Sequence, residues 1–271
     1  MRPPEASADP SYDGIGLFQR DIERAVASGE EVQNRSLLIG DRVVRIRFIG
    51  GGLALPLMRA LAHLETAPAS GHPDLSITAW SGAGSAIAMS PLLGLAARIA
   101  TNELSPRHEI PEMTNGSVRT TSLPWDGILT MYDVMNRAAY IRIEDPERLP
   151  IWDHGAPFRT IFNWWLSDAG MNCVHAGAVG TAQGAVVLTG KGGSGKSTSS
   201  LACVGSELGY LSDDYCVLST DGTPEVFSLY NTGKLRDDDD LARQPHCRPW
   251  VVNPDHGGDQ KYMMYLAEHV P

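Results

Sequence analysis

The alternation of apolar and polar side chains predicts several strands in the first half of the chain. Residues 42–49 alternate arginine with valine, isoleucine and phenylalanine, as a half-buried strand does, and three glycines then end the pattern. Leucines at helical spacing between 53 and 64 predict a helix directly afterwards. Further elements are expected as a helix at 16–28, strands at 75–80, 117–122, 127–133 and 138–143, and a loop leading into a short helix within 85–100. This half therefore has the pattern of an α+β unit.

The second half alternates helical and strand patterns over shorter spacings. Only a few residues, 180–184, separate two apolar runs, which favours an antiparallel hairpin because a parallel pair needs a crossover of a dozen or more residues. Asp221-Gly222 predicts the turn of a second hairpin. The expected helices are 156–166, 197–208 and 259–269, and the expected strands are 172–179, 184–189, 209–218 and 225–230.

Composition and charge exclude some classes of protein. The chain has 271 residues, of which 42% are hydrophobic, and a formal net charge of −10. That charge argues against a nucleic-acid or anionic-membrane surface, where a basic excess is expected. No apolar run reaches the ~18 residues of a membrane span, and the N-terminus lacks the apolar core of an export signal. Four cysteines without a C-x-x-C pair predict thiols in a reducing cytoplasm.

One segment carries a specific chemical signal. Gly190-Lys191-Gly192-Gly193-Ser194-Gly195-Lys196-Ser197 fits the Walker A pattern G-x-x-x-x-G-K-[ST], between a predicted strand and a predicted helix. In such a loop the backbone N–H groups surround a phosphate, Lys196 reaches its outer oxygens, and the Ser197 hydroxyl holds Mg²⁺. The expected nucleotide-binding residues are Gly190, Gly192, Gly193, Ser194, Gly195, Lys196, Ser197 and Thr198.

Two adjacent carboxylates follow one helix downstream, and a histidine precedes the loop strand. Phosphoryl transfer uses such a set: one carboxylate anchors the metal and another accepts the proton of the attacking hydroxyl. Asp213 and Asp214 supply the carboxylates, and His175 is placed to orient one of them. A strand-end turn remains the alternative for the pair, and a core histidine the alternative for His175.

These segments together resemble a known family. His175-Ala-Gly-Ala-Val, the phosphate loop and Gly209-Tyr-Leu-Ser-Asp213-Asp214 are similar to the catalytic core of HPr kinase/phosphorylase, whose fold is related to phosphoenolpyruvate carboxykinase. The resemblance is closer to the HPr-kinase-like serine kinases found with lasso-peptide and asparagine-synthetase-type gene clusters. It extends from Arg42-Val-Val-Arg-Ile-Arg through Trp152-Asp-His-Gly-Ala-Pro-Phe-Arg to Leu229-Tyr-Asn-Thr-Gly-Lys234-Leu and Asp259-Gln-Lys261.

The resemblance implies an ATP- and Mg²⁺-dependent serine kinase in the cytoplasm. Its substrate would be a peptide or small protein, in that family the C-terminal serine of a lasso-peptide precursor. The implied catalytic residues are Asp213 as base, Lys196 and His175, and the implied metal ligands are Ser197 and Asp214. No counterpart of the Arg- and Gly-rich segment of HPr kinase/phosphorylase follows the core, so HPr recognition and phosphorolysis are not expected. Relatives continue beyond Lys261, so a partner subunit, including a second copy of this chain, could supply part of the substrate surface.

The predicted architecture has three parts. Residues 1–35 form a leader, 36–150 a smaller accessory α+β domain, and 151–271 a P-loop domain of the HPr-kinase-like and phosphoenolpyruvate-carboxykinase-like type, α/β (α+β mixed) with a hairpin-containing mixed sheet. A mainly parallel sheet is the alternative. Two other functions stay open: a small-molecule hydroxyl kinase, and a nucleotide-sensing module that binds ATP without transferring phosphate.

Overall fold

A computed structural model describes residues 14–68, 70–81, 104–105, 107–255 and 261–270. The chain divides into two compact units: residues 1–38, 42–56 and 66–150 form the first, and residues 39–41, 57–65 and 151–271 form the second. The loop and short helix predicted within 85–100 lie outside the described residues.

The first unit is built on a six-stranded mixed sheet with the order β1-β2-β3-β6-β5-β4. The pairs β2–β3 and β3–β6 are parallel, and β6–β5 and β5–β4 are antiparallel. The strands are β1 Val32–Ile39, β2 Arg42–Ile49, β3 Leu75–Ser81, β4 Val118–Leu123, β5 Ile128–Asp133 and β6 Ala138–Ile143. The prediction of a mixed α/β composition is therefore confirmed; the chain contains a mixed sheet, but it lies in the first unit and not in residues 151–271, where it was expected.

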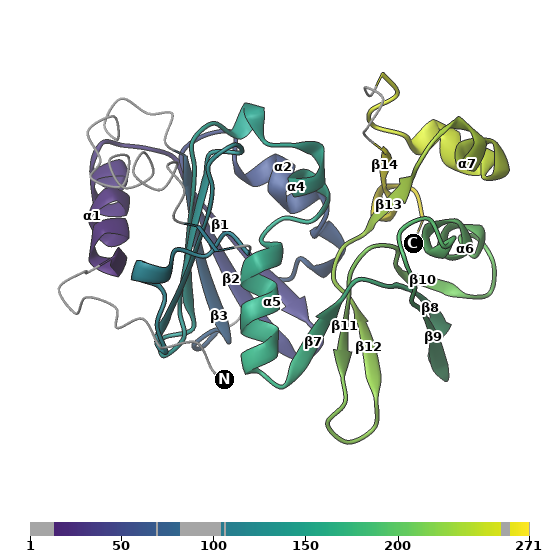
Figure 1. Ribbon diagram of the computed structural model, residues 1–271, viewed down its shortest axis with the longest axis horizontal. Coiled ribbons are helices and arrows are strands. Elements are labelled where there is room, and N and C mark those ends of the chain that lie inside the picture. Colours follow the sequence, from purple (N-terminus) through teal and green to yellow (C-terminus); the bar gives the residue numbers. More distant parts are fainter. Residues whose placement is uncertain (1–13, 69, 82–103, 106, 256–260, 271) are drawn as a thin grey trace. The chain divides into compact units, whose positions relative to one another are not determined.

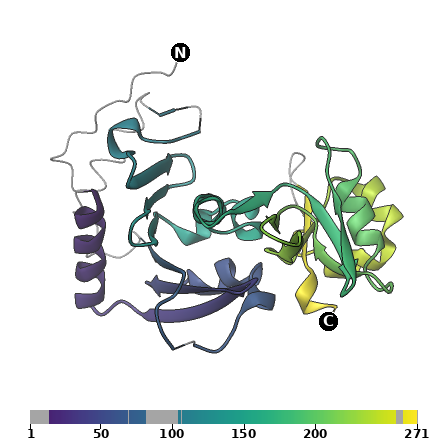
Figure 2. The ribbon, with the colours of Figure 1, turned by 90° about the horizontal axis from the view of Figure 1, so that it is seen from below.

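One helix packs on this sheet through its apolar side. In α1 (Gly14–Ala27) the residues Phe18, Ile22 and Ala25 recur at helical spacing and are buried against Trp80 and other sheet residues. Phe18 meets Trp80 edge to face, with ring centroids 5.0 Å apart. Figures 1 and 2 show α1 standing beside the strands. The helix predicted at 16–28 is confirmed, whereas the one predicted at 53–64 is shorter: α2 (Ala54–Arg59), then a 3₁₀ turn (Ala62–Leu64).

The second unit consists of three small sheets and short helices. The sheets have the orders β10-β8-β9, β12-β11-β7 and β13-β14, and each of these pairs is antiparallel. Figure 1 shows α6 beside β10 and β8, and α7 beside the β13–β14 pair. The elements are α4 Ile151–Gly155, α5 Arg159–Asp168, β7 Met171–Val174, β8 Gly177–Thr181, β9 Gly184–Leu188, α6 Lys196–Ala202, β10 Gly209–Ser212, β11 Cys216–Ser219, β12 Glu225–Ser228, β13 Thr232–Leu235, α7 Asp238–Arg243 and β14 Tyr262–Tyr265.

Both predicted hairpins are confirmed. β8 and β9 pair with Thr181 opposite Gly184, and β11 and β12 pair with Ser219 opposite Glu225. The helix after the phosphate loop, expected to reach 208, ends at Ala202. The four cysteines are free thiols, as expected.

Two predicted strands are each broken into two, and the breaks matter for the site. The stretch 172–179 forms β7 and β8, and the stretch 209–218 forms β10 and β11, so each chain segment passes from one sheet to another. His175 lies in the first break, and Asp213 and Asp214 lie in the second. Adjacent side chains in a continuous strand point to opposite faces. The break therefore allows both carboxylates to face the same region.

The helix predicted at 259–269 is wrong. Residues 262–265 form β14, whose four side chains are buried, and its Met263 pairs with Lys234 of β13. A short apolar run such as Tyr-Met-Met-Tyr does not distinguish a strand from a buried helix by periodicity, and here the pairing with β13 decides.

We expect Gly180→Ala to lower the stability of the hairpin that leads into the phosphate loop. An added methyl group would meet the Ala185 Cα and the Gly184 carbonyl oxygen, each at 2.7 Å, so the backbone of β9 would have to shift. Overpacking of this kind costs about 1–3 kcal/mol. Urea unfolding measures it, with Gly184→Ala as the control, because nothing lies within 4 Å of a methyl group there. Equal stability of the two variants would contradict the packing described for β8 and β9.

Candidate functional site

A cavity of about 420 Å³ in the second unit collects most of the residues that the motifs single out. Gly190 and Ser194 of the predicted set belong to the loop but not to the cavity lining. The lining residues are His175, Gly192, Gly193, Gly195, Lys196, Ser197, Thr198, Ser199, Asp213, Asp214, Lys234, Arg236, Asp240, Arg243 and Lys261. The fold thus brings together segments separated by up to 86 positions, from His175 to Lys261.

Three glycines give the phosphate loop its backbone conformation. Gly190, Gly193 and Gly195 have φ angles of 149°, 79° and 91°, which side chains with a Cβ rarely adopt. At Gly190 a Cβ would also lie 2.7 Å from the Ser194 hydroxyl oxygen. Gly192 has no such requirement. The loop conformation thus depends on these three positions.

Lys196 is a buried cation held by neutral groups. Its relative exposure is 8%, and its Nζ donates to the carbonyl oxygens of Gly190 at 2.9 Å and Lys191 at 3.2 Å. Among the described residues no carboxylate forms an ion pair with it. Buried charges in proteins are normally paired. A cation aimed into a cavity with only carbonyl partners fits an anionic ligand.

Asp213 lines the cavity and is buried, with a relative exposure of 2%. Its Oδ2 accepts a hydrogen bond from the Lys234 backbone N–H at 2.7 Å. Burial raises the pKa of Asp213 to about 6, although hydrogen bonds from the Ser197 hydroxyl and the Lys234 N–H oppose that rise. Its Oδ1 is buried and finds no hydrogen-bond partner in the described part of the chain.

The pairing of Asp213 with Ser197 fits a magnesium site. Mg²⁺ is commonly bound by one or two carboxylates together with substrate phosphates and water. The unpartnered Oδ1 of Asp213 and the hydroxyl of Ser197 are oxygen ligands of that kind. In the described ranges no group of three or more His, Cys, Asp or Glu side chains could hold a metal by itself. A magnesium ion here would thus rely on phosphate oxygens for part of its coordination.

Asp214, in contrast to Asp213, contacts two basic side chains. Its side chain is 19% exposed; Oδ2 lies 2.5 Å from the Lys234 Nζ and Oδ1 lies 3.1 Å from the His175 Nε2. Burial acts to raise the pKa of Asp214, but Lys234, His175 and Lys261 outweigh it and hold the pKa below its usual value. Asp214 is thus the ionised, cavity-facing member of the pair.

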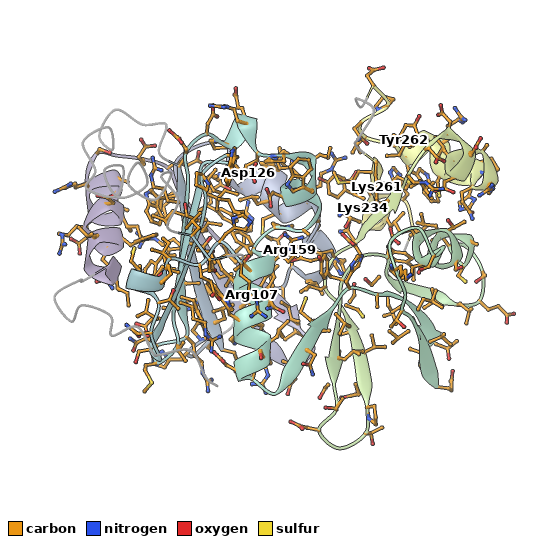
Figure 3. The ribbon with its side chains drawn as sticks, viewed as in Figure 1. Arg107, Asp126, Arg159, Lys234, Lys261 and Tyr262 are labelled. Carbon is orange, nitrogen blue, oxygen red and sulfur yellow. The ribbon has the colours of Figure 1, made fainter. Side chains whose placement is uncertain are left out.

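His175 is oriented by an aromatic stack. Its ring stacks on Tyr215, with centroids 5.2 Å apart and an interplanar angle of 27°. The Tyr215 hydroxyl accepts from the Arg159 guanidinium at 3.2 Å, and Arg159 comes from α5 (Figure 3). Although the His175 side chain is 55% exposed, this stack aims its Nε2 at Asp214.

The sequence reasoning gave no role to several basic residues of the cavity. Lys234 belongs to β13 and Lys261 directly precedes β14 (both are labelled in Figure 3), and both line the cavity. With Lys196, Arg236 and Arg243 they make five basic residues against three aspartates in the lining, so the site is locally positive although the whole chain is acidic. The motif around Lys234 was a usable signal, whereas nothing in the local pattern singled out Arg236 or Arg243.

The aspartate run 237–240 is only partly exposed to solvent. The Asp237 side chain caps α7 by accepting from the Asp240 N–H at 2.9 Å. Asp240 is only 9% exposed and lies 3.4 Å from Arg243 and 3.6 Å from Arg236. The run therefore positions two arginines of the cavity.

Comparison with protein-family models and with curated proteins finds no significant match to this chain. None of the described helices is long and apolar enough to cross a membrane.

Asp213→Asn and Asp214→Asn are expected to change the free energy of unfolding in opposite directions. The folded-state pKa of Asp213 is raised to about 6 from 3.8, so its contribution to stability falls as pH rises from about 4 to about 6 and stays unfavourable above that. At pH 7.5 Asp213→Asn should then raise the free energy of unfolding by on the order of 2 kcal/mol.

The folded-state pKa of Asp214 is lowered, so its contribution is present above its unfolded-state pKa of 3.8 and is lost on acidification. Asp214→Asn should therefore destabilise the protein at pH 7.5, by about 1–3 kcal/mol. Urea unfolding at several pH values between 4 and 8, without metal, measures both variants. Changes of the same sign would contradict the environments described for the two carboxylates.

Proposed function

We propose that the protein is an ATP- and Mg²⁺-dependent kinase that transfers the γ-phosphoryl group to a serine hydroxyl of a peptide or small protein. The acceptor of first choice is the C-terminal serine of a ribosomally made precursor peptide of the lasso type. One observation carries this proposal: a single cavity joins a phosphate loop with a buried cation, Lys196, to a buried carboxylate and a cavity-facing one.

The loop and its lysine account for phosphate binding. The backbone of residues 190–195 would surround the phosphates, and Lys196 would exchange its two carbonyl partners for phosphate oxygens of greater charge. Arg236 and Arg243, both largely exposed at the cavity, add positive charge for the transferred group. Bound Mg²⁺ would neutralise further charge on the phosphates.

The geometry favours a division of labour opposite to the one that the resemblance implies. Asp213 is buried beside the phosphate-loop Ser197, which suits a metal-side carboxylate. Asp214 is open to the cavity, where a serine hydroxyl can reach it; its lowered pKa makes it a weaker base than Asp213, so access and not basicity favours it as the acceptor of the serine proton. His175 then holds Asp214 in place.

Lys234 connects the two carboxylates. Its backbone N–H donates to Asp213 and its Nζ donates to Asp214, so one residue of β13 fixes both side chains. Two neighbouring carboxylates would otherwise repel each other and one would bind a proton. Lys234 therefore lowers the pKa of Asp214 and keeps it ionised, whereas burial still raises the pKa of Asp213.

Two other functions use the same site differently. A small-molecule hydroxyl kinase would show the same dependence on Lys196 and Mg²⁺ with another acceptor. A nucleotide sensor would bind ATP without transfer and would not need Asp214. The test is incubation with γ-labelled ATP, Mg²⁺ and serine peptides, including peptides that end in serine, followed by mass spectrometry to locate the phosphate. ATP binding without transfer to any peptide or small alcohol would favour the sensor.

Lys196→Ala should abolish phosphoryl transfer and weaken ATP binding, because the phosphates lose their buried cation. Lys191→Ala is the matched control: it removes the same charge from the same loop, but its side chain is exposed and does not line the cavity. Turnover and ATP affinity are the measurements. If both variants keep normal affinity, the loop does not bind ATP as proposed.

The two aspartates should separate kinetically. Asp214→Asn should reduce turnover by ~10²-fold or more, the usual scale of general base catalysis, with ATP·Mg²⁺ affinity near normal. Asp213→Asn should instead raise the Mg²⁺ concentration needed for activity. Turnover across a Mg²⁺ titration checks this. The reverse pattern would make Asp213 the base and Asp214 the metal ligand.

A further inference from the structure

A second cavity, of about 350 Å³, lies in the same unit behind the phosphate-loop helix. Its volume is at the lower end of the range of small-molecule sites. The turn after α6, the start of β10, the end of β12 and the 3₁₀ turn Leu266–Glu268 contribute its walls. The phosphate-loop motif and the Asp213-Asp214 pair do not line it, although Gly209, Tyr210 and Asn231 belong to segments that carry the family resemblance.

The cavity wall contains an ordered chain of hydrogen bonds. The Asn231 Nδ2 donates to the Arg59 carbonyl oxygen at 3.0 Å, which fixes the orientation of the amide. The same Nδ2 lies 3.4 Å from the His63 Nδ1, and the His63 Nε2 lies 2.7 Å from the Ser228 Oγ. Since an amide nitrogen only donates, the network assigns the His63 Nδ1 as acceptor and Nε2–H as donor.

These hydrogen-bond directions leave one free O–H donor, that of Ser228, at one end of the network. Ser228 accepts from His63, so its own O–H is free to donate to a group in the cavity. At the other end, the Asn231 Oδ1 is buried and has no hydrogen-bond partner among the described residues; Asn231 itself is 4% exposed. An unpaired buried acceptor is costly, and a ligand N–H or O–H would relieve that cost. The cavity wall therefore holds one donor and one buried acceptor, which a ligand reaches through a small shift of the Asn231 side chain.

The rest of the lining is uncharged and partly apolar. No Asp, Glu, Lys or Arg side chain lines the cavity, and the hydrogen bond that His63 Nδ1 accepts from Asn231 requires a neutral imidazole. Val204, Leu266 and Val270 supply an apolar wall continuous with the core around Leu201. A nucleotide or another polyanion finds no counter-charge here.

Three segments line both cavities. The α6 segment runs from Lys196 to the turn at Val204–Ser206, β10 carries Tyr210 and leads to Asp213, and Asn231 precedes Lys234 by three residues. Three residues of strand span ~10 Å. A ligand in the second cavity would contact the other ends of the segments that carry Lys196, Asp213 and Lys234.

We propose that the second cavity is an effector site for a small uncharged molecule with an apolar body and an amide or hydroxyl group, which accepts from Ser228 and donates to Asn231, and that its occupancy changes the affinity of the phosphate loop for ATP. The second half of this proposal rests on the proposed function, because it takes ATP as the ligand of the loop. The first half does not.

The binding test uses cyclohexanecarboxamide as probe and the full chain, with ligand-observed NMR as readout. Cyclohexanecarboxylate, which has nearly the same shape and a charge, is the control ligand and should not bind. Ser228→Ala should weaken binding of the carboxamide about 5–10-fold, the worth of one hydrogen bond. Ala267→Trp, at an exposed position of the lining, should abolish binding by filling the cavity.

Ser219→Ala, on the neighbouring strand β11 and outside the lining, should leave binding unchanged. Equal binding of the carboxylate, or full binding to Ser228→Ala and Ala267→Trp, would overturn the site. With the cavity saturated, ATP affinity should change 5-fold or more, the lower end of usual allosteric couplings. An unchanged ATP affinity would overturn the coupling, and no ATP binding at all would instead count against the proposed function.

Discussion

The burial of the Lys196 positive charge constrains the conformation of the phosphate loop and the elements at its two ends. A buried cation without a carboxylate partner is unfavourable, so the loop supplies two carbonyl oxygens at 2.9 and 3.2 Å. Those carbonyls point inward only because Gly190, Gly193 and Gly195 adopt backbone angles that other residues rarely reach. The β8–β9 hairpin and α6 then hold the two ends of the loop.

The two carboxylates show how stability and site chemistry oppose each other within two adjacent residues. Asp214 is stabilised by Lys234 and His175, whereas Asp213 is buried with one oxygen unpartnered and its pKa raised to about 6. A fold selected for stability alone would place an amide or an apolar residue at Asp213. The unpartnered oxygen beside Ser197 is therefore the observation on which the proposed Mg²⁺ site rests.

The sequence predicted what depends on local pattern and failed where long-range packing decides. The alternation of side chains predicted the strand 42–49, and turn residues and short links predicted the two hairpins. All three elements are confirmed. The apolar run 262–265 became a strand because β13 pairs with it. The breaks at 175–176 and 213–215 arise because each segment changes sheets, and no local residue preference signals that change. The residues of the candidate motif set, apart from Gly190 and Ser194, line one cavity, but the different environments of Asp213 and Asp214 were not predictable from the sequence.

The same dependence on packing explains why the second cavity left no trace in the sequence. His63, Ser228 and Asn231 come from three segments and form their chain of hydrogen bonds only after the strands β12 and β13 and the turn Ala62–Leu64 have packed. His63 and Ser228 belong to no motif, and Asn231 lies in the segment 229–235 that carries the resemblance, where nothing in the pattern singles it out. The fixed hydrogen-bond directions distinguish this cavity from an ordinary packing defect. The Arg59 carbonyl fixes the Asn231 amide, and the amide fixes the tautomer of His63. That tautomer leaves the Ser228 hydroxyl as a donor in a cavity with an uncharged lining.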